Sequence, residues 1–306
     1  MGYTNKAFEE LDVLDDFLLS AIAADKEVGE AFCKRVISVL LQREVGKVRV
    51  IAQCVIPALT LSHRGIRMDV EVEEFGDEDE GPVTNVYDLE PHLQDNVDLP
   101  RHNRFYQARI DSRYVNRGEK SFSKMPNLFV VTILNFDPFG YDYMMYTVEN
   151  RCLEVKELEY QDGLQFIYFY TGGTKGGNKK IGTMLKYLQE STADNATDES
   201  TRELHGYVSR EKMMPEVKQE YMMFDEFLYY KCKAAADEAT KKTEKDTKIQ
   251  DILELLEDLG EIPDGLRSCL EGIEDMNLLR RYLKLSAKAG SVEDFVEKMK
   301  SGTRTE

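Results

Sequence analysis

The stretch NLFVVTILNF, residues 127–136, constrains the fold of this chain more than any other segment. It is an almost unbroken run of apolar and β-branched residues. Such a run is typical of a β-strand that is buried on both faces, so it predicts a sheet with a covering layer on each side.

The segments around this strand alternate between helical and strand periodicity. Apolar residues recur at helical spacing in three places, residues 7–41, 101–115 and 181–190. Short β-branched or aromatic runs predict further strands at residues 47–56, 66–75, 83–89 and 164–170. This order predicts an α/β fold in which a mixed sheet is flanked by helices.

The C-terminal third has a different texture. The polar segment STADNATDEST, residues 191–201, predicts a surface loop, and one long helix should follow over residues 202–238, with Pro215 able to kink or break it. From residue 248 onward, helical stretches separated by a glycine-containing turn predict a small helical module. We expect an α/β domain over residues 1–230 and an all-helical region over residues 231–306.

Composition limits the classes of function. The formal charge of -17 argues against nonspecific coating of nucleic acid but leaves room for a local basic patch. No apolar run approaches the ~20 residues of a membrane span, and the N-terminus lacks the features of a signal peptide. The five cysteines are scattered and form no CxxC pair, which favours reduced thiols. We therefore expect a cytoplasmic protein that does not contact membranes.

One segment is strongly basic. Residues 101–124 carry seven Lys or Arg against two acids, a pattern expected of an element that contacts phosphate. Arg101, Arg104 and Arg109 are candidate DNA contacts, although a solvated helix face would give the same pattern. Lys179 is a further candidate, in the glycine-rich TGGTKGGNKKIG. That loop is not a P-loop, because no Ser or Thr follows the lysine.

Two acids on expected neighbouring strands are candidate metal ligands. Asp69 lies in IRMDVEV and Glu90 ends NVYDLE. Carboxylates on adjacent strands can converge on one Mg²⁺ ion, which prefers one or two carboxylates together with water and a substrate phosphate. The alternative is that Asp69, which alternates with Met68 and Val70, is an ordinary solvent-facing strand residue.

An ordered set of motifs resembles one known family. The segments LDDFLLSAI, HRGIRMDVEV, VYDLE, LPRHNRFYQARID, FVVTILNFDPFG and IGTMLKYLQE together resemble the recombination-promoting nuclease and transposase family of the PD-(D/E)XK superfamily. The resemblance covers most of residues 10–230. It implies a restriction-endonuclease-like fold and a Mg²⁺- or Mn²⁺-dependent DNA endonuclease that uses a metal-activated water, with a role in recombination or transposition.

The resemblance also implies roles for single residues. Asp69 and Glu90 match the metal-binding acids, and Asp16, with Asp15 as the alternate, resembles the acid supplied by the first helix. By the same resemblance, an R-x-Y-Y-Q signature is matched by Arg104, Tyr106 and Gln107, while Phe105 replaces one tyrosine. The resemblance implies that these residues orient the scissile phosphate or the third motif residue.

The chain departs from the family at the end of the acidic motif. His92 stands where related nucleases place Lys or Gln. A histidine can act as a base, a donor or a metal ligand, but it lacks the fixed charge and reach of lysine. Pro91 removes a backbone donor, so the strand should end there or lie at an edge.

Three functional hypotheses follow. The first is the DNA endonuclease, in which a homodimer would let two copies of the site cut both strands. The second is a catalytically inactive nuclease-fold protein that binds DNA or assembles with other proteins. The third is that the acidic helical tail is a protein-interaction module, which predicts an exposed apolar groove on residues 248–300.

Overall fold

The computed structural model describes residues 6–53, 55–56, 66–67, 69–76, 81–93, 98–115 and 121–302, the side chains of residues 55, 56, 66, 67 and 302 excepted. The chain divides into two compact units, residues 6–222 and the part from Met223 onward. The division falls within a long helix, eight residues before the boundary expected from the sequence.

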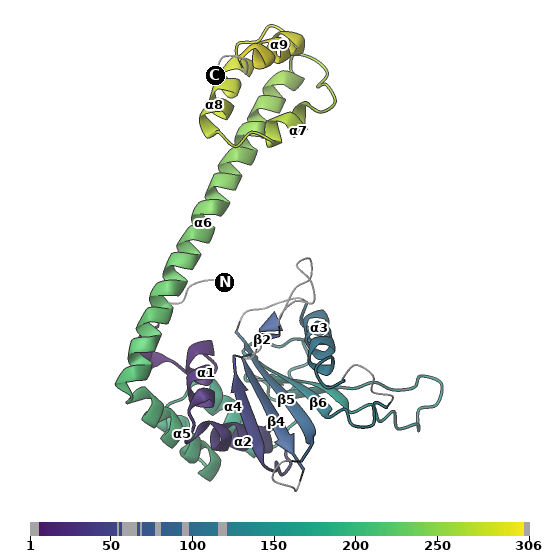
Figure 1. Ribbon diagram of the computed structural model, residues 1–306, viewed down its shortest axis with the longest axis vertical. Coiled ribbons are helices and arrows are strands. Elements are labelled where there is room, and N and C mark those ends of the chain that lie inside the picture. Colours follow the sequence, from purple (N-terminus) through teal and green to yellow (C-terminus); the bar gives the residue numbers. More distant parts are fainter. Residues whose placement is uncertain are drawn as a thin grey trace. The chain divides into compact units, whose positions relative to one another are not determined.

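The first unit is built on a six-stranded mixed sheet with the order β1-β4-β5-β6-β8-β7 (Figure 1). Its strands are β1 (Val48–Ala52), β4 (Val70–Phe75), β5 (Val83–His92), β6 (Asn127–Leu134), β7 (Met145–Val148) and β8 (Leu164–Tyr170). β5, β6 and β8 are parallel, whereas β1, β4 and β7 join their neighbours antiparallel. β2 (Val55–Ile56) and β3 (Ile66–Arg67) form a separate antiparallel pair.

Helices cover both faces of this sheet. α1, α2, α4 and α5 lie on one face and α3 lies on the other (Figure 1). The bounds are η1 (Phe8–Glu10), α1 (Asp16–Ala24), α2 (Gly29–Leu40), α3 (Leu99–Asp111), α4 (Lys179–Gln189), η2 (Ala193–Asn195) and α5 (Glu199–Lys212). The predicted α/β architecture, a mixed sheet flanked by helices, is confirmed.

The apolar run NLFVVTILNF forms β6. This strand lies between β5 and β8 and pairs with both in parallel. Val130 and Val131 point to opposite faces and are each 1% exposed, as expected for a strand covered on both sides. The prediction of a strand buried on both faces is confirmed.

The expectation of one helix over residues 202–238 is wrong. α5 ends at Lys212, and α6 (Pro215–Glu257) begins at the proline. Proline suits the first position of a helix because the N–H it lacks would have no partner there. The preceding polar segment is also more than a loop: Asn195 is buried in η2, and Asp198 caps α5 by accepting the Thr201 N–H at 2.8 Å.

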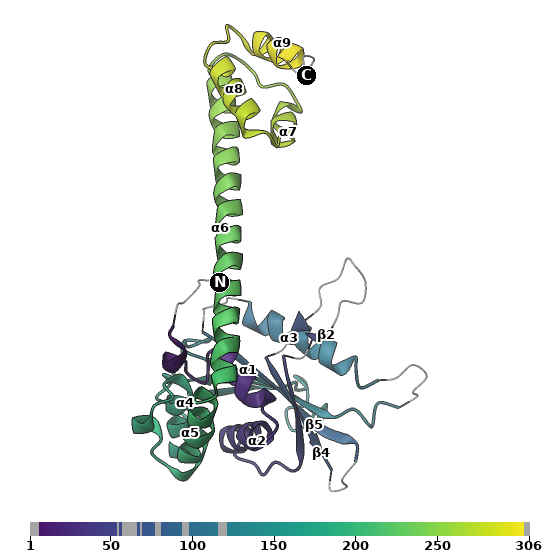
Figure 2. The same cartoon turned by 60° about the vertical axis from the view of Figure 1, so that its left-hand side comes forward.

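The second unit is entirely helical in its described residues (Figure 2). It contains the rest of α6 together with α7 (Leu266–Glu271), α8 (Met276–Ser286) and α9 (Val292–Gly302). Its apolar residues pack into a core of their own, composed of Ile249, Ile252, Leu253, Leu256, Leu266, Leu270, Leu279, Tyr282, Val292 and Phe295. The predicted all-helical C-terminal region is confirmed.

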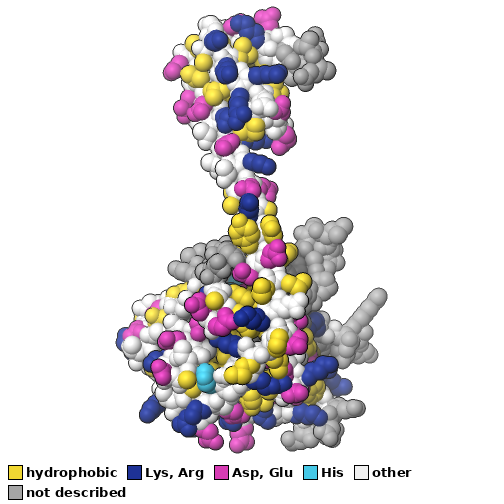
Figure 3. Space-filling view, turned by 90° about the vertical axis from the view of Figure 1, so that its left-hand side faces the viewer, with side chains coloured by type: hydrophobic (Ala, Val, Ile, Leu, Met, Phe, Trp, Pro, Cys, Tyr) yellow, Lys and Arg dark blue, Asp and Glu magenta, His cyan; other side chains and the backbone are white. Residues whose placement is uncertain are grey.

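Several exposed apolar side chains lie along α6, outside this core (Figure 3). Met222, Met223, Phe227 and Tyr230 are each more than half exposed. The apolar residues of the later helices instead face one another, so the side chains expected to line a groove on residues 248–300 largely form the module's interior. None of the helices in the described ranges is both long enough and apolar enough to span a membrane.

Candidate active site

The two acids singled out in the sequence meet at one end of the β4–β5 pair. β4 runs antiparallel to β5 with Val70 opposite Leu89, which puts Asp69 next to Glu90 just beyond the ladder. The Asp69 backbone N–H donates to Glu90 Oε1 at 3.2 Å. Glu90 is 6% exposed, so the β5 residue that contacts Asp69 is buried.

The structure adds a third acid that the sequence argument missed. Asp88 lies two residues before Glu90, on the same face of β5, and is 0% exposed. Neither of its carboxylate oxygens has a hydrogen-bond partner among the described residues. Strand alternation alone could have placed Asp88 beside Glu90. Its burial depends on α3, which covers this face.

Glu71 of β4 lies directly opposite Asp88. It is also 0% exposed, and Arg113, just after α3, forms an ion pair with Glu71 Oε2. Glu71 Oε1 is buried without a hydrogen-bond partner in the described part of the chain. Arg113 is thus the cation that offsets one acid of this face.

Burial and mutual repulsion change the proton affinity of these acids. The pKa of Asp88 is raised well above its ordinary value, chiefly by burial and then by Glu71 and Asp69, although Arg113 opposes the rise. The pKa of Glu90 is also well raised, by burial first and then by Asp88 and Asp69. A cation among these groups would lower the pKa of both acids, because its positive charge would stabilise carboxylates that water cannot reach.

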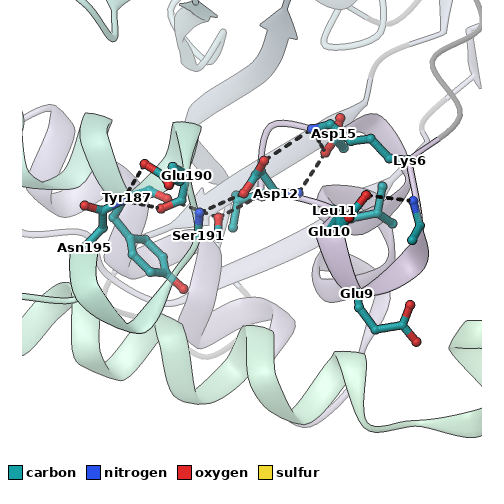
Figure 4. Close-up of polar contacts among 12 residues, drawn as sticks. Lys6, Glu9, Glu10, Leu11, Asp12, Asp15, Tyr187, Glu190, Ser191 and Asn195 are labelled. Carbon is teal, nitrogen blue, oxygen red and sulfur yellow. Dashed lines mark hydrogen bonds and ion pairs between the residues drawn. The ribbon is translucent and has the colours of Figure 1, made fainter.

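Asp16 and Asp15 have different environments. Asp16 is the first residue of α1, and its charge contributes to the raised pKa of Glu90, so it is electrostatically part of the cluster. Asp15 Oδ2 accepts hydrogen bonds from Lys6 Nζ and from the Asp12 N–H, each at 2.7 Å (Figure 4). Asp15 therefore anchors the N-terminal segment, whereas the charge of Asp16 acts on Glu90.

His92 ends β5 two residues after Glu90. Its Nε2 is buried and has no hydrogen-bond partner among the described residues. Burial, and secondarily His102, lowers the pKa of His92 to about 4, so the imidazole is neutral at pH 7. Pro91 is accommodated because its ladder partner is Ile133 of β6, while the pairing of β5 with β4 ends at Leu89. Within the described residues Pro91 thus lies at a local edge, as the sequence predicted.

α3 packs on the same face through polar and apolar contacts. Asn103 Nδ2 donates to Thr132 Oγ1 of β6 at 2.8 Å, and Ile110 is fully buried against β5 and β6. Gln107 donates to Asp111 of its own helix, so its side chain is engaged one turn away. Phe105, which replaces a tyrosine of the R-x-Y-Y-Q signature, is 39% exposed.

The candidate DNA contacts are distributed unevenly. Arg101 is largely exposed and pairs with Asp98 at 3.4 Å, and Arg104 is exposed on α3. Arg109 is 8% exposed, so a DNA backbone laid along the outer surface of α3 would meet Arg101 and Arg104 but not Arg109.

Lys179 is exposed at the start of α4. The register of the parallel strands puts the end of β8 at the same end of the sheet as His92, two strands away. The glycine-rich loop leaves β8 there and lines a hollow of about 580 Å³ together with Lys179 and Lys186. A larger hollow, of about 830 Å³, lies at the opposite end, where β6 and β8 begin at Asn127 and Leu164.

The fit of a metal ion depends on how many protein ligands it needs. Within the ranges that the structure describes, no three His, Cys, Asp or Glu side chains are grouped closely enough to hold an ion by themselves. Mg²⁺ usually keeps several waters and binds through one or two carboxylates and a substrate phosphate. The acids Asp69 and Glu90, beside the unpartnered oxygens of Asp88, suit that hard-oxygen chemistry.

No protein-family model, no curated protein and no solved structure matches this chain. The likeness to the PD-(D/E)XK nucleases therefore depends on the sequence motifs alone. The fold and the site together define a mixed α/β protein with a buried acidic cluster at the β4–β5 pair.

Proposed function

We propose that this chain is a metal-dependent DNA endonuclease whose catalytic centre lies where Asp69 meets Glu90. One observation carries the proposal: Asp88, fully buried beside these two acids, has no hydrogen-bond partner for either oxygen among the described residues. An unpaired buried carboxylate costs several kcal/mol of folding free energy, and that cost is offset where the group serves a cation. A role in recombination or transposition is part of this proposal.

Asp69 and Glu90, with Asp16 from α1, would hold the Mg²⁺ or Mn²⁺ ion. When bound, the ion would supply positive charge to the phosphodiester and make a neighbouring water more acidic. His92 is neutral at pH 7, so it can orient the attacking water, although a pKa of about 4 makes it a weak base. His92 cannot supply the permanent positive charge of a lysine, so the cation and nearby arginines must balance the charge that develops on the phosphate.

The DNA would approach along α3. Arg101 and Arg104 are exposed on this helix, and Asn103 ties it to β6 on the acidic face. Phosphate contacts from such arginines would position the backbone without reading base sequence. A homodimer would bring two copies of the site to opposite strands of the duplex.

The rival is a nuclease-fold protein that binds DNA or assembles with partners without cutting. It is favoured by the depth of Asp88, by the replacement of Lys or Gln by His92, and by the position of both described hollows away from the acids. The two hypotheses make opposite statements about phosphodiester hydrolysis and the same statement about DNA binding.

Nicking of supercoiled plasmid by untagged protein in Mg²⁺ or Mn²⁺ tests the proposal. Asp69→Asn and Glu90→Gln should each lower the nicking rate at least about 100-fold, because removal of a second-shell metal partner already costs about 10–100-fold. Glu159→Gln, at an exposed acid in the loop before β8, is the matched control and should nick like the wild type.

Equal nicking by all four proteins would mean a contaminating nuclease or a different site. Absence of nicking by the wild type, with DNA still bound in a gel-shift assay, would replace the proposal by the noncatalytic alternative.

A further inference from the structure

An aromatic loop, residues 135–144 with the sequence NFDPFGYDYM, follows β6 at the end of the sheet where His92 ends β5. Three of its rings are exposed: Phe139 at 36%, Tyr141 at 68% and Tyr143 at 45%. A group of exposed rings, unlike a single one, indicates an interaction surface. The proposed function gives these rings no role.

We propose that the aromatic loop, together with the lysines of the glycine-rich segment beside it, binds single-stranded DNA by stacking bases on its exposed rings. The inference deepens the proposed function, on which its catalytic meaning rests, because it names the form of DNA that the site would receive. The binding itself can be measured whether or not the protein cuts DNA.

The aromatic loop packs on the same face of the sheet as the acidic cluster. Side chains directly opposite on neighbouring strands share a face, and Glu90 is opposite Thr132 of β6. The same row continues through Tyr168 of β8 and Tyr146 of β7. The ring of Phe139 packs on both tyrosines, with centroids 5.2 Å and 5.0 Å away. Neighbouring strands are about 4.8 Å apart, so Tyr146 lies roughly 14 Å from Glu90, which a few nucleotides of one strand can span.

Hydrogen bonds hold the backbone of the aromatic loop in place. Tyr146 Oη accepts the backbone N–H of Tyr141 at 3.3 Å and that of Tyr143 at 3.1 Å. The same hydroxyl donates to Asp137 Oδ1 at 2.7 Å, and Asp137 Oδ2 accepts the Asp142 N–H at 2.6 Å. The exposed rings therefore project from a preorganised backbone, which reduces the entropy lost when a ligand binds.

The glycine-rich segment supplies positive charge beside the rings. Residues 171–186 contain four lysines, all exposed, and no acid, on a chain with a formal charge of -17. Lys175 Nζ donates to the backbone oxygen of Tyr141 at 3.2 Å. Gly176 lets the two segments approach closely, because its φ is +63° and a Cβ there would lie 2.8 Å from a ring carbon of Tyr143. Cations beside aromatic rings are the combination with which proteins bind single-stranded nucleic acid.

The arrangement favours a single strand over a duplex. Bases in a duplex are stacked on one another and present only their edges in the grooves, whereas unpaired bases offer their faces to aromatic rings. A protein partner is the other class of ligand that exposed rings could bind. Four lysines without an acid match the charge of a phosphate backbone, so we assign the surface to DNA.

The test is fluorescence anisotropy of a labelled oligothymidylate of about 16 nucleotides, with the full-length protein in EDTA so that no metal-dependent cleavage occurs. Tyr141→Ala and Tyr143→Ala should each weaken binding at least about fivefold, because each removes a ring on which a base stacks. Tyr141→Phe keeps the ring and should bind like the wild type. Tyr160→Ala is the matched control, since Tyr160 is 57% exposed in the loop before β8, at the opposite end of the sheet, and it should also bind like the wild type.

The salt dependence of binding tests the lysines. Lys175→Gln should weaken binding and make the slope of log affinity against log salt concentration shallower by about 0.7, the value for one phosphate contact on a single strand. An unchanged slope would remove Lys175 from the surface.

Oligothymidylate binding that is equal in the wild type, Tyr141→Ala and Tyr143→Ala would overturn the inference. So would a wild type that does not bind the oligothymidylate, or an equal loss of binding to a duplex of the same length. Circular dichroism must show that the variants are folded; if Tyr143→Ala is not, the more exposed Tyr141 alone decides.

Plasmid nicking separates the two proposals. Single-strand binding through these tyrosines in a protein that never nicks would leave the inference standing and the nuclease refuted. Mg²⁺-dependent nicking with unchanged single-strand binding in the tyrosine variants would do the reverse.

Discussion

Glu211 gives the sharpest test of the electrostatics of the first unit. It lies near the end of α5, is 2% exposed, and its Oε2 has no hydrogen-bond partner among the described residues. Burial, followed by the charge of Asp25, raises its pKa from 4.5 to about 7, while Arg210 opposes the rise and Glu220 adds to it. We expect Glu211→Gln to stabilise the folded protein at pH 8.

The magnitude follows from linkage between ionisation and folding. A pKa that rises from 4.5 to about 7 on folding corresponds to at most about 3.5 kcal/mol, since each change of one in pKa is about 1.4 kcal/mol. Because the folded state holds the proton more tightly, the wild type loses stability as the pH rises from about 4.5 to about 7. The advantage of Glu211→Gln should therefore be small at pH 4.5, grow through this window, and stay constant above it.

The assay is urea unfolding followed by circular dichroism at pH 5, 6, 7 and 8, with wild type and variant in parallel. The exposed Glu216, substituted as Glu216→Gln at the start of α6, is the matched control for loss of a surface carboxylate. Stability curves for the wild type and Glu211→Gln that stay parallel from pH 5 to pH 8 would refute the reasoning.

Two further predictions concern other buried groups. Arg113→Ala should lower the free energy of unfolding by roughly 2–3 kcal/mol at pH 7, below the 3–5 kcal/mol of a fully buried pair because the arginine side chain is 28% exposed. Burial raises the pKa of Glu71 and Arg113 opposes the rise, so urea titration at pH 7 and pH 5 should show a smaller loss at the lower pH. Cys33 should resist iodoacetamide at pH 8 in the native protein, because complete burial raises its pKa to about 12, whereas the exposed Cys269 should react. Peptide mass spectrometry measures the modification of both cysteines. Prompt modification of Cys33 in the native protein would contradict its placement in the core.

Much of the fold could be predicted because its signals are local. The periodicity of the apolar residues indicated the flanking helices and every strand of the sheet except β7, which was missed. The uninterrupted run of β6 indicated that this strand is buried on both faces. The error at Pro215 was also local: the residue was noted as a possible break, but its preference for the first turn of a helix decides where α6 begins.

The site could be predicted only in part. Asp69 and Glu90 were found because each lies in a segment with a clear strand pattern, and their contact follows from antiparallel pairing. Asp88 shares that face by simple alternation, but nothing in its neighbours along the chain shows that α3 buries it. The exposure of Phe105 and the burial of Arg109 likewise depend on how α3 is rotated against the sheet.

By itself, the sequence determined the α/β class, the helical C-terminal region and the two acids that meet, because hydrophobic periodicity and strand alternation are properties of short segments. The tertiary structure decided which acids are buried together, and that the ring of His92 contacts that of His102. It also decided that Asp15 binds Lys6 while the charge of Asp16 raises the pKa of Glu90. These features depend on strand register and on the packing of α3, which bring together residues that no local pattern connects, and burial there sets the charge of each group.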